Sequence, residues 1–191
     1  MNAHKTSLSL LLAGLIAVAG CSAKVSYRSL TPVNAATSAN VALEVVDARD
    51  ASLVGADKSR VGNVRNGWGM PFGVHEDSPD RIPQLVTEAT ADALRQAGVG
   101  IDKSASRVLV AQVKDFWVDG YVGYKSMVDV EYSLRDRDGK QLWTFLAQGA
   151  SGGMPWGGTS FAEEYLTKAL ADCSVRAAQQ FQQPAFQKLV F

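Results

Sequence analysis

The sequence is poor in cysteine and histidine and carries no net charge. Two cysteines and two histidines occur among 191 residues, and 19 basic side chains balance 19 acidic ones. A neutral chain has no broad basic field to hold a phosphate backbone, so we expect no nucleic-acid partner. The shortage of cysteine excludes a disulfide framework, and the fold must depend on its hydrophobic core.

The sequence also lacks an apolar run long enough to span a bilayer. Its one sustained run, residues 8–19, has about a dozen residues, whereas a spanning helix needs ~20. Lys5 precedes this run, and small residues follow it up to Cys21. A basic start, a short apolar block and small residues before a cleavage point are typical of a secretory signal peptide. We therefore expect residues 1–20 to be removed.

The sequence Val18-Ala19-Gly20-Cys21 resembles the lipobox of bacterial lipoproteins. This resemblance implies that Cys21 becomes the triacylated mature N-terminus, carrying palmitate-type chains. Each buried methylene contributes ~0.8 kcal/mol, so even two long chains make detachment rare. Ser22, in place of aspartate, implies sorting to the outer membrane of a two-membrane host. The alternative is an incidental thiol beside an ordinary signal peptide.

Three segments are expected along the chain. Loss of residues 1–20 removes Lys5 and no acid, which leaves 18 basic and 19 acidic side chains. Lipid rather than charge must then hold the protein at a membrane. Residues 21–40 are rich in Ser, Thr, Ala and Asn and indicate a flexible tether. Residues 41–191 suit a single periplasmic domain with one core.

Hydrophobic periodicity predicts an α+β domain with the order β-α-β-β-β-α. Strands are expected over 41–49, 107–118, 124–136 and 140–148, and helices over 81–97 and 160–182. Asp138-Gly139 indicates a hairpin turn between the last two strands. The predicted architecture is an antiparallel sheet of about four strands with both helices on one face.

The Gly- and Pro-rich stretch 53–83 is long for a connection inside a compact domain. It therefore predicts either a functional loop or a short hairpin. A second Gly-rich loop is expected over 149–158, ahead of the last helix.

The layout of the chain resembles the YajG-like bacterial lipoproteins. The lipobox is followed by a strand ending in Asp47-Ala-Arg49, a loop through Gly62, and a helix ending in Leu94-Arg-Gln-Ala-Gly98. The resemblance extends over about residues 18–182. It implies an envelope location and supplies no catalytic residues.

No pattern in the chain predicts catalysis, a cofactor or a metal. His75-Glu76-Asp77, with Asp80 nearby, lacks the several His or Cys ligands of zinc sites and is expected to be an acidic turn before a helix. Cys173 lies on the apolar stripe of the last predicted helix and is expected to be buried. Glu163-Glu164 should be a solvated first turn, and 149–158 lacks the Gly-Lys-Ser/Thr of a phosphate loop.

Large apolar side chains stand among glycines and prolines in the two Gly-rich stretches. Trp68, Phe72 and Trp156 either fold back as lids over the core or form a partner-binding surface. We therefore expect a non-catalytic, lipid-anchored protein on the periplasmic side of the outer membrane, which binds an envelope protein or assists envelope transport or assembly. The alternative is a glycan-binding module or enzyme that acts near the cell wall through these loops and His75.

Overall fold

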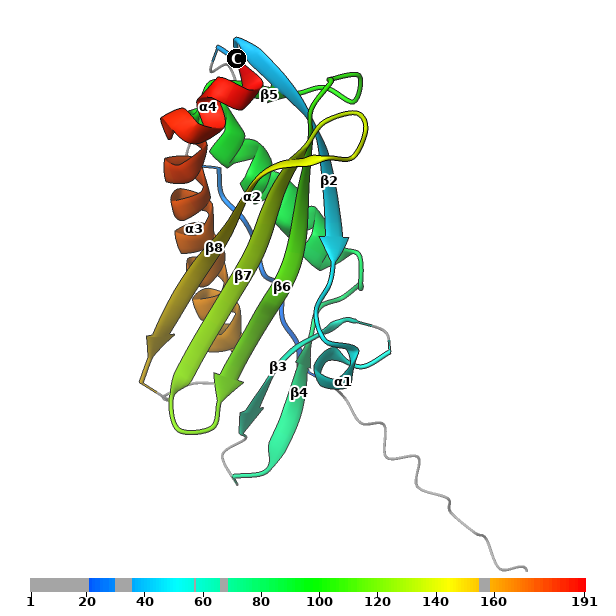
Figure 1. Cartoon of the computed structure of the whole chain (residues 1–191). Coiled ribbons are helices and arrows are strands. Elements are labelled where there is room, and N and C mark those ends of the chain that lie inside the picture. Colours follow the sequence, from blue (N-terminus) through cyan, green and yellow to red (C-terminus); the bar gives the residue numbers. More distant parts are fainter. Residues whose placement is uncertain (1–20, 30–35, 57, 66–68, 155–158) are drawn as a thin grey trace, which may run out of the picture.

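The computed structural model describes residues 21–29, 36–56, 58–65, 69–154 and 159–191. Eight strands and four helices form within these ranges (Figure 1). In chain order they are β1 (Cys21–Ser22), β2 (Ala39–Asp47), α1 (Ala51–Val54), β3 (Arg60–Arg65), β4 (Pro71–His75), α2 (Arg81–Gln96), β5 (Val99–Ile101), β6 (Val108–Gly120), β7 (Tyr124–Arg135), β8 (Gln141–Gly153), α3 (Thr159–Phe181) and α4 (Pro184–Val190). None of the helices in the described part of the chain is long and apolar enough to cross a membrane.

The predicted α+β class is confirmed, but the sheet has eight strands rather than about four. Strands β6, β7 and β8 form the predicted antiparallel meander. The other edge of β6 pairs in parallel with β2 along its first half and with β3 at its end. The expectation of a purely antiparallel sheet is therefore wrong. Parallel neighbours require a long crossover, and the chain between β2 and β6 supplies it.

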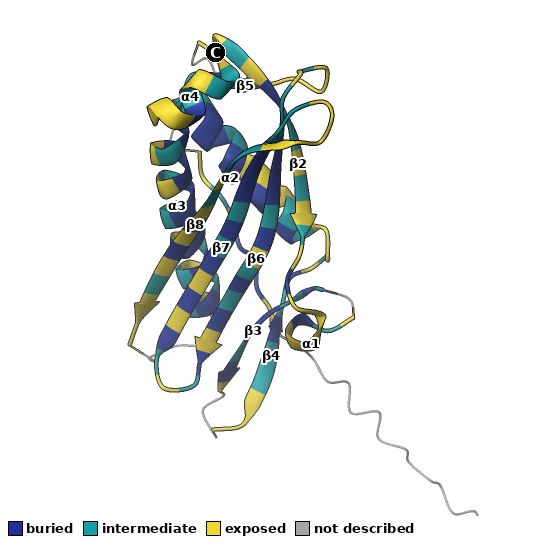
Figure 2. Cartoon of the chain, in the orientation of Figure 1, coloured by how far each residue is buried: buried dark blue, intermediate teal, exposed yellow. Residues whose placement is uncertain are grey.

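Helices α2 and α3 cover one face of the sheet, as predicted (Figure 1). Their observed bounds agree with the predicted ones to within one residue at each end. The opposite face of β6 and β7 is open, and along both strands buried residues alternate with exposed or half-buried ones (Figure 2). The core thus lies between the sheet and the two helices.

A short helix that the periodicity did not predict closes one end of this core. Pro184 follows the end of α3, as expected, and also begins α4, because the first turn of a helix needs no N–H from proline. Phe186 of α4 is fully buried. Its ring centroid lies 5.0 Å from that of Trp143 and 4.8 Å from that of Phe181.

The Gly- and Pro-rich stretch 53–83 contains the hairpin β3–β4, which is one of its two predicted alternatives. An ion pair at the end of β2 holds this hairpin. Arg49 lies 2.8 Å from Asp47 and is almost fully buried, and it also donates to the carbonyl of Arg60 at 3.0 Å.

Strand β8 continues through Gly153, so the loop predicted over 149–158 begins later than expected. Gly149 lies where α3 crosses the strand. A Cβ atom at this position would lie 2.0 Å from the carbonyl oxygen of Ala169. Glycine at this position permits close packing between helix and sheet. From composition alone, a glycine-rich strand of this kind looks the same as a glycine-rich loop.

Candidate functional site: docking of the N-terminal segment

The segment that begins at Cys21 packs on the domain. Strand β1 pairs in parallel with β4, so that Cys21 lies opposite Val74. The N–H of Ala23 donates to the backbone of β4 at 2.8 Å, and Ala23 and Val25 are buried in the core. The expected flexible tether is therefore wrong for residues 21–29. Their partners lie 51 or more positions away in sequence, where local composition carries no signal.

Glu76 and Arg81 bind the backbone of Val25 from two sides. Glu76 Oε1 accepts the N–H of Val25 at 3.1 Å, and the Arg81 guanidinium donates to its carbonyl at 3.2 Å. Glu76 is only 5% exposed. Burial raises its pKa to about 7, against the opposing effects of the Val25 N–H and Arg81. Together with Lys24 and Asp77, these residues line a cavity of about 230 Å³.

Two further acids bind the same segment. The Ser22 hydroxyl donates to Asp77, and the backbone N–H of Lys24 donates to Glu163 of α3 at 3.3 Å. The sequence predicts an acidic turn at Asp77 and a solvated first turn at Glu163. In the structure both side chains accept a hydrogen bond from the N-terminal segment.

Asp92 of α2 binds the end of the N-terminal segment, at Tyr27 and Ser29. Its side chain is fully buried and accepts hydrogen bonds from the hydroxyls of Tyr27 at 2.8 Å and Ser29 at 2.6 Å. The Tyr27 hydroxyl also lies 2.9 Å from the Ser174 hydroxyl of α3. Arg95, 3.4 Å from Asp92, supplies a counter-charge. The segment is thus bonded to both helices, and sequence analysis singled out neither Asp92 nor Tyr27.

The stability of the protein should fall as Glu76 ionises. Burial raises the folded-state pKa above its ordinary value of 4.5, so the stabilisation is complete at low pH and is lost as the pH rises through about 7. Glu76→Gln keeps an acceptor for Val25 and removes the charge. At about pH 8 we expect the variant to be more stable than wild type by roughly 2 kcal/mol.

Urea denaturation of both proteins at about pH 4 and about pH 8 measures this difference. At the lower pH the difference should nearly vanish, because the wild-type side chain is then neutral. Glu88→Gln, an exposed change on α2, is the matched control and should show no such pH dependence. An equal difference in stability between Glu76→Gln and wild type at both pH values would contradict the raised pKa of Glu76.

Two further candidates for chemistry are His75 and Cys173. His75 Nδ1 lies 3.0 Å from the hydroxyl of Ser59, which is almost buried just before β3. Cys173 is 1% exposed, as its apolar stripe predicts, and burial raises its pKa to about 12. A buried, protonated thiol is a poor nucleophile. Among the described residues, no three His, Cys, Asp or Glu side chains gather as a metal site.

The predicted partner-binding residues are only partly described. Trp68 and Trp156 lie outside the described residues. Phe72, in β4, is half-buried and packs against the core. Met70 and Met154, which border the same two connections, are largely exposed.

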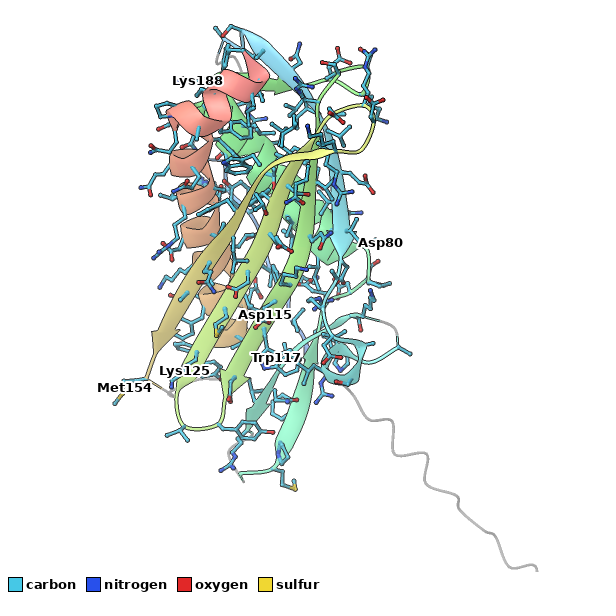
Figure 3. All side chains as sticks on the ribbon, viewed as in Figure 1. Asp80, Asp115, Trp117, Lys125, Met154 and Lys188 are labelled. Atoms are coloured by element: carbon cyan, nitrogen blue, oxygen red, sulfur yellow. The ribbon has the colours of Figure 1, made fainter. Side chains whose placement is uncertain are left out.

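A groove beside β2 is a feature that sequence analysis missed. In the described part of the chain, β2 pairs on this side only with β5, over Ala39–Val41. Beyond that point Leu43 and Val45 line a groove of about 390 Å³, whose other wall is α2. Asp80, labelled in Figure 3, and Glu88 also line it.

No protein-family model matches this sequence, and no curated protein matches it significantly. A Xanthomonas campestris protein of family DUF330 is similar in structure, with a TM-score of 0.52 and 15% identity, covering 85% of this chain and 98% of its own. PelC from Paraburkholderia phytofirmans, solved as a dodecamer, gives a TM-score of 0.37 and 21% identity, covering 72% and 91%. The lipoprotein GNA1162 from Neisseria meningitidis gives 0.32 and 14%, covering 64% and 90%. The first similarity shows a shared fold and nothing finer, and the other two are too weak to show even that.

Proposed function

We propose that this chain is a lipid-anchored lipoprotein of the bacterial envelope, similar in role to the YajG-like group. Residues 1–20 are its signal peptide, and Cys21 is its acylated N-terminus. The domain faces the periplasm from the outer membrane. It is a non-catalytic binding or accessory protein in envelope transport or assembly.

The observation that carries this proposal is the position of Cys21 in the fold. Cys21 pairs with Val74 of β4, and Ala23 and Val25 lie in the core, so these contacts are made by residues that remain after removal of residues 1–20. Acyl chains on Cys21 would be attached directly to the folded domain. The anchor would then determine how the domain stands on the membrane as well as where it resides.

A binding role, rather than a catalytic one, is supported by two features of the described residues. The open edge of β2 and the groove beside it offer a surface for an extended segment of a partner. The Cys173 thiol is buried and protonated, which leaves it without the thiolate that a cysteine nucleophile needs.

Mass spectrometry of the purified mature protein tests the anchor. We expect an N-terminus at Cys21 that carries three acyl chains, and we expect the protein to fractionate with membranes. Cys21→Ala should be neither acylated nor membrane-bound. Cys173→Ala, the matched control, should keep both properties because its thiol is buried. An unmodified N-terminus, or cleavage at another position, would overturn the proposal.

A further inference from the structure

The ends of several strands meet at one end of the domain. Val64 of β3 pairs with Gly120 at the end of β6, and Tyr124 at the start of β7 pairs with Gly153 at the end of β8. The end of β3, the β6–β7 turn and the end of β8 therefore lie side by side, at the lower end of the molecule in Figure 1.

Apolar side chains at this end are unusually exposed. Val122, in the β6–β7 turn, is 92% exposed, and Met154, just after β8, is 73% exposed. Met70, just before β4, is 60% exposed. Single exposed apolar residues are ordinary, but several at the tips of adjoining strands indicate a surface that meets an apolar phase. We name Met70, Tyr121, Val122 and Met154 the strand-tip surface.

The opposite end of the same meander is built differently. The β7–β8 turn there contains Asp136-Arg137-Asp138-Gly139-Lys140, whereas the β6–β7 turn contains Tyr121-Val122-Gly123. Both are connections of similar length between long antiparallel strands. A charged turn can therefore join two such strands, and the formation of the β6–β7 turn does not by itself require the exposed Val122.

An aromatic ring and basic side chains accompany the apolar tips. The Arg65 guanidinium lies 4.8 Å from the centre of the Tyr121 ring. Lys125 is exposed at the start of β7, and Figure 3 shows it at the same end as Met154. Asp119 is also at this end and accepts the backbone N–H of Tyr121 at 3.0 Å. Tyrosine, arginine and lysine around exposed apolar groups are typical of proteins at the bilayer–water boundary.

The position of Cys21 relative to these tips matches the dimensions of that boundary. Cys21 lies opposite Val74, three residues from Pro71 at the start of β4. At ~3.3 Å per residue, Cys21 stands roughly 10 Å behind the end of the strand. Because β1 is parallel to β4, the N-terminal end of β1, at Cys21, faces the same end of the domain. Interfacial apolar groups are buried ~5–10 Å into the boundary between headgroups and acyl chains.

We infer that the strand-tip surface inserts into the phospholipid headgroup layer of the membrane to which Cys21 is anchored. The domain then stands with its strands steeply inclined to the membrane, and its charged β7–β8 turn faces away. This inference rests on the proposed lipid anchor, which brings the tips to the membrane. The tips in turn hold the domain in one orientation, which a single attachment point does not do.

A polarity-sensitive fluorophore attached at the tip tests this orientation. Val122→Cys is labelled in the acylated full-length mature protein, which is then incorporated into vesicles of phosphatidylethanolamine and phosphatidylglycerol. The acylated Cys21 is blocked and Cys173 is buried, so the label is specific. We expect a blue-shifted emission and strong quenching by lipids that carry a quencher near the headgroup.

Ile101→Cys is the matched control, because Ile101 is exposed in β5 at the opposite end of the sheet from the tips. Its label should keep the emission seen in water and be quenched several-fold less. Vesicle flotation is measured first on every sample. Failure to float would overturn the anchor and this inference together. Flotation without preferential quenching at position 122 would overturn the inference alone.

Discussion

Replacing Asp92 with alanine is expected to release residues 21–29 from the helices and to destabilise the protein by about 3 kcal/mol. The change leaves the Tyr27 and Ser29 hydroxyls without their carboxylate acceptor and the nearby Arg95 without its counter-charge. Tyr27 is half-buried and its hydroxyl keeps the contact with Ser174, whereas the exposed Ser29 can bond to water instead. Most of the loss therefore comes from the contacts that the buried Asp92 itself makes. Urea denaturation gives the loss of stability.

Trypsin digestion reports the release of the segment directly. Cleavage after Lys24 and Arg28 requires the backbone there to leave α2 and α3, so it should accelerate strongly in Asp92→Ala. Glu88→Ala, an exposed change on the same helix, should leave both stability and cleavage near wild type. Faster global unfolding with no change in cleavage under native conditions would show that Asp92 stabilises the core without holding the segment.

Gly149→Ala is expected to destabilise the protein by a similar amount, about 3 kcal/mol, by forcing α3 away from β8. The added Cβ would lie 2.0 Å from the Ala169 carbonyl oxygen and 2.5 Å from the Cys173 nitrogen. Both contacts are with backbone atoms of a long helix, and these atoms cannot move aside as the end of a flexible side chain can. Thermal or urea unfolding measures the loss.

Ala150→Ser provides the matched control for Gly149→Ala. Ala150 is the next residue of β8 and its side chain is exposed, so a hydroxyl can be added there while the backbone N–H keeps its bond to Asp172 of α3. Its stability should remain within about 0.5 kcal/mol of wild type. Equal losses in the two variants would mean that β8 tolerates no change at all, and the close approach of α3 would not be the cause.

Local pattern predicted the elements that alternate or repeat along their own length. Strand β7 and helices α2 and α3 were found within one residue of their predicted bounds, because each buries one face and its period is visible in the sequence. Strand β8 began within one residue of its predicted start but continued past its predicted end to Gly153. The hairpin β3–β4 was only an alternative, because glycines obscure its alternation. Strand β5, of three residues, is too short to show any period.

The candidate site was largely hidden from sequence reasoning. Cys21 was singled out by its local resemblance to a lipobox, which needs only neighbouring residues. The residues that bind the segment after it, such as Asp92 and Glu163, carry no motif and lie 63 and 139 positions from their partners. Composition therefore predicted a tether where the folded protein has a docked segment.

The sequence by itself predicted the α+β class and the burial of Cys173, and it is also the source of the proposed leader and of the proposed anchor at Cys21. Each of these depends on neighbouring residues or on the period of a single element. Only the tertiary structure decided that residues 21–29 are part of the domain and that the strand-tip surface lies on the same side as Cys21. Those features depend on which distant segments pair, and pairing is selected by burial and hydrogen bonding across the whole fold.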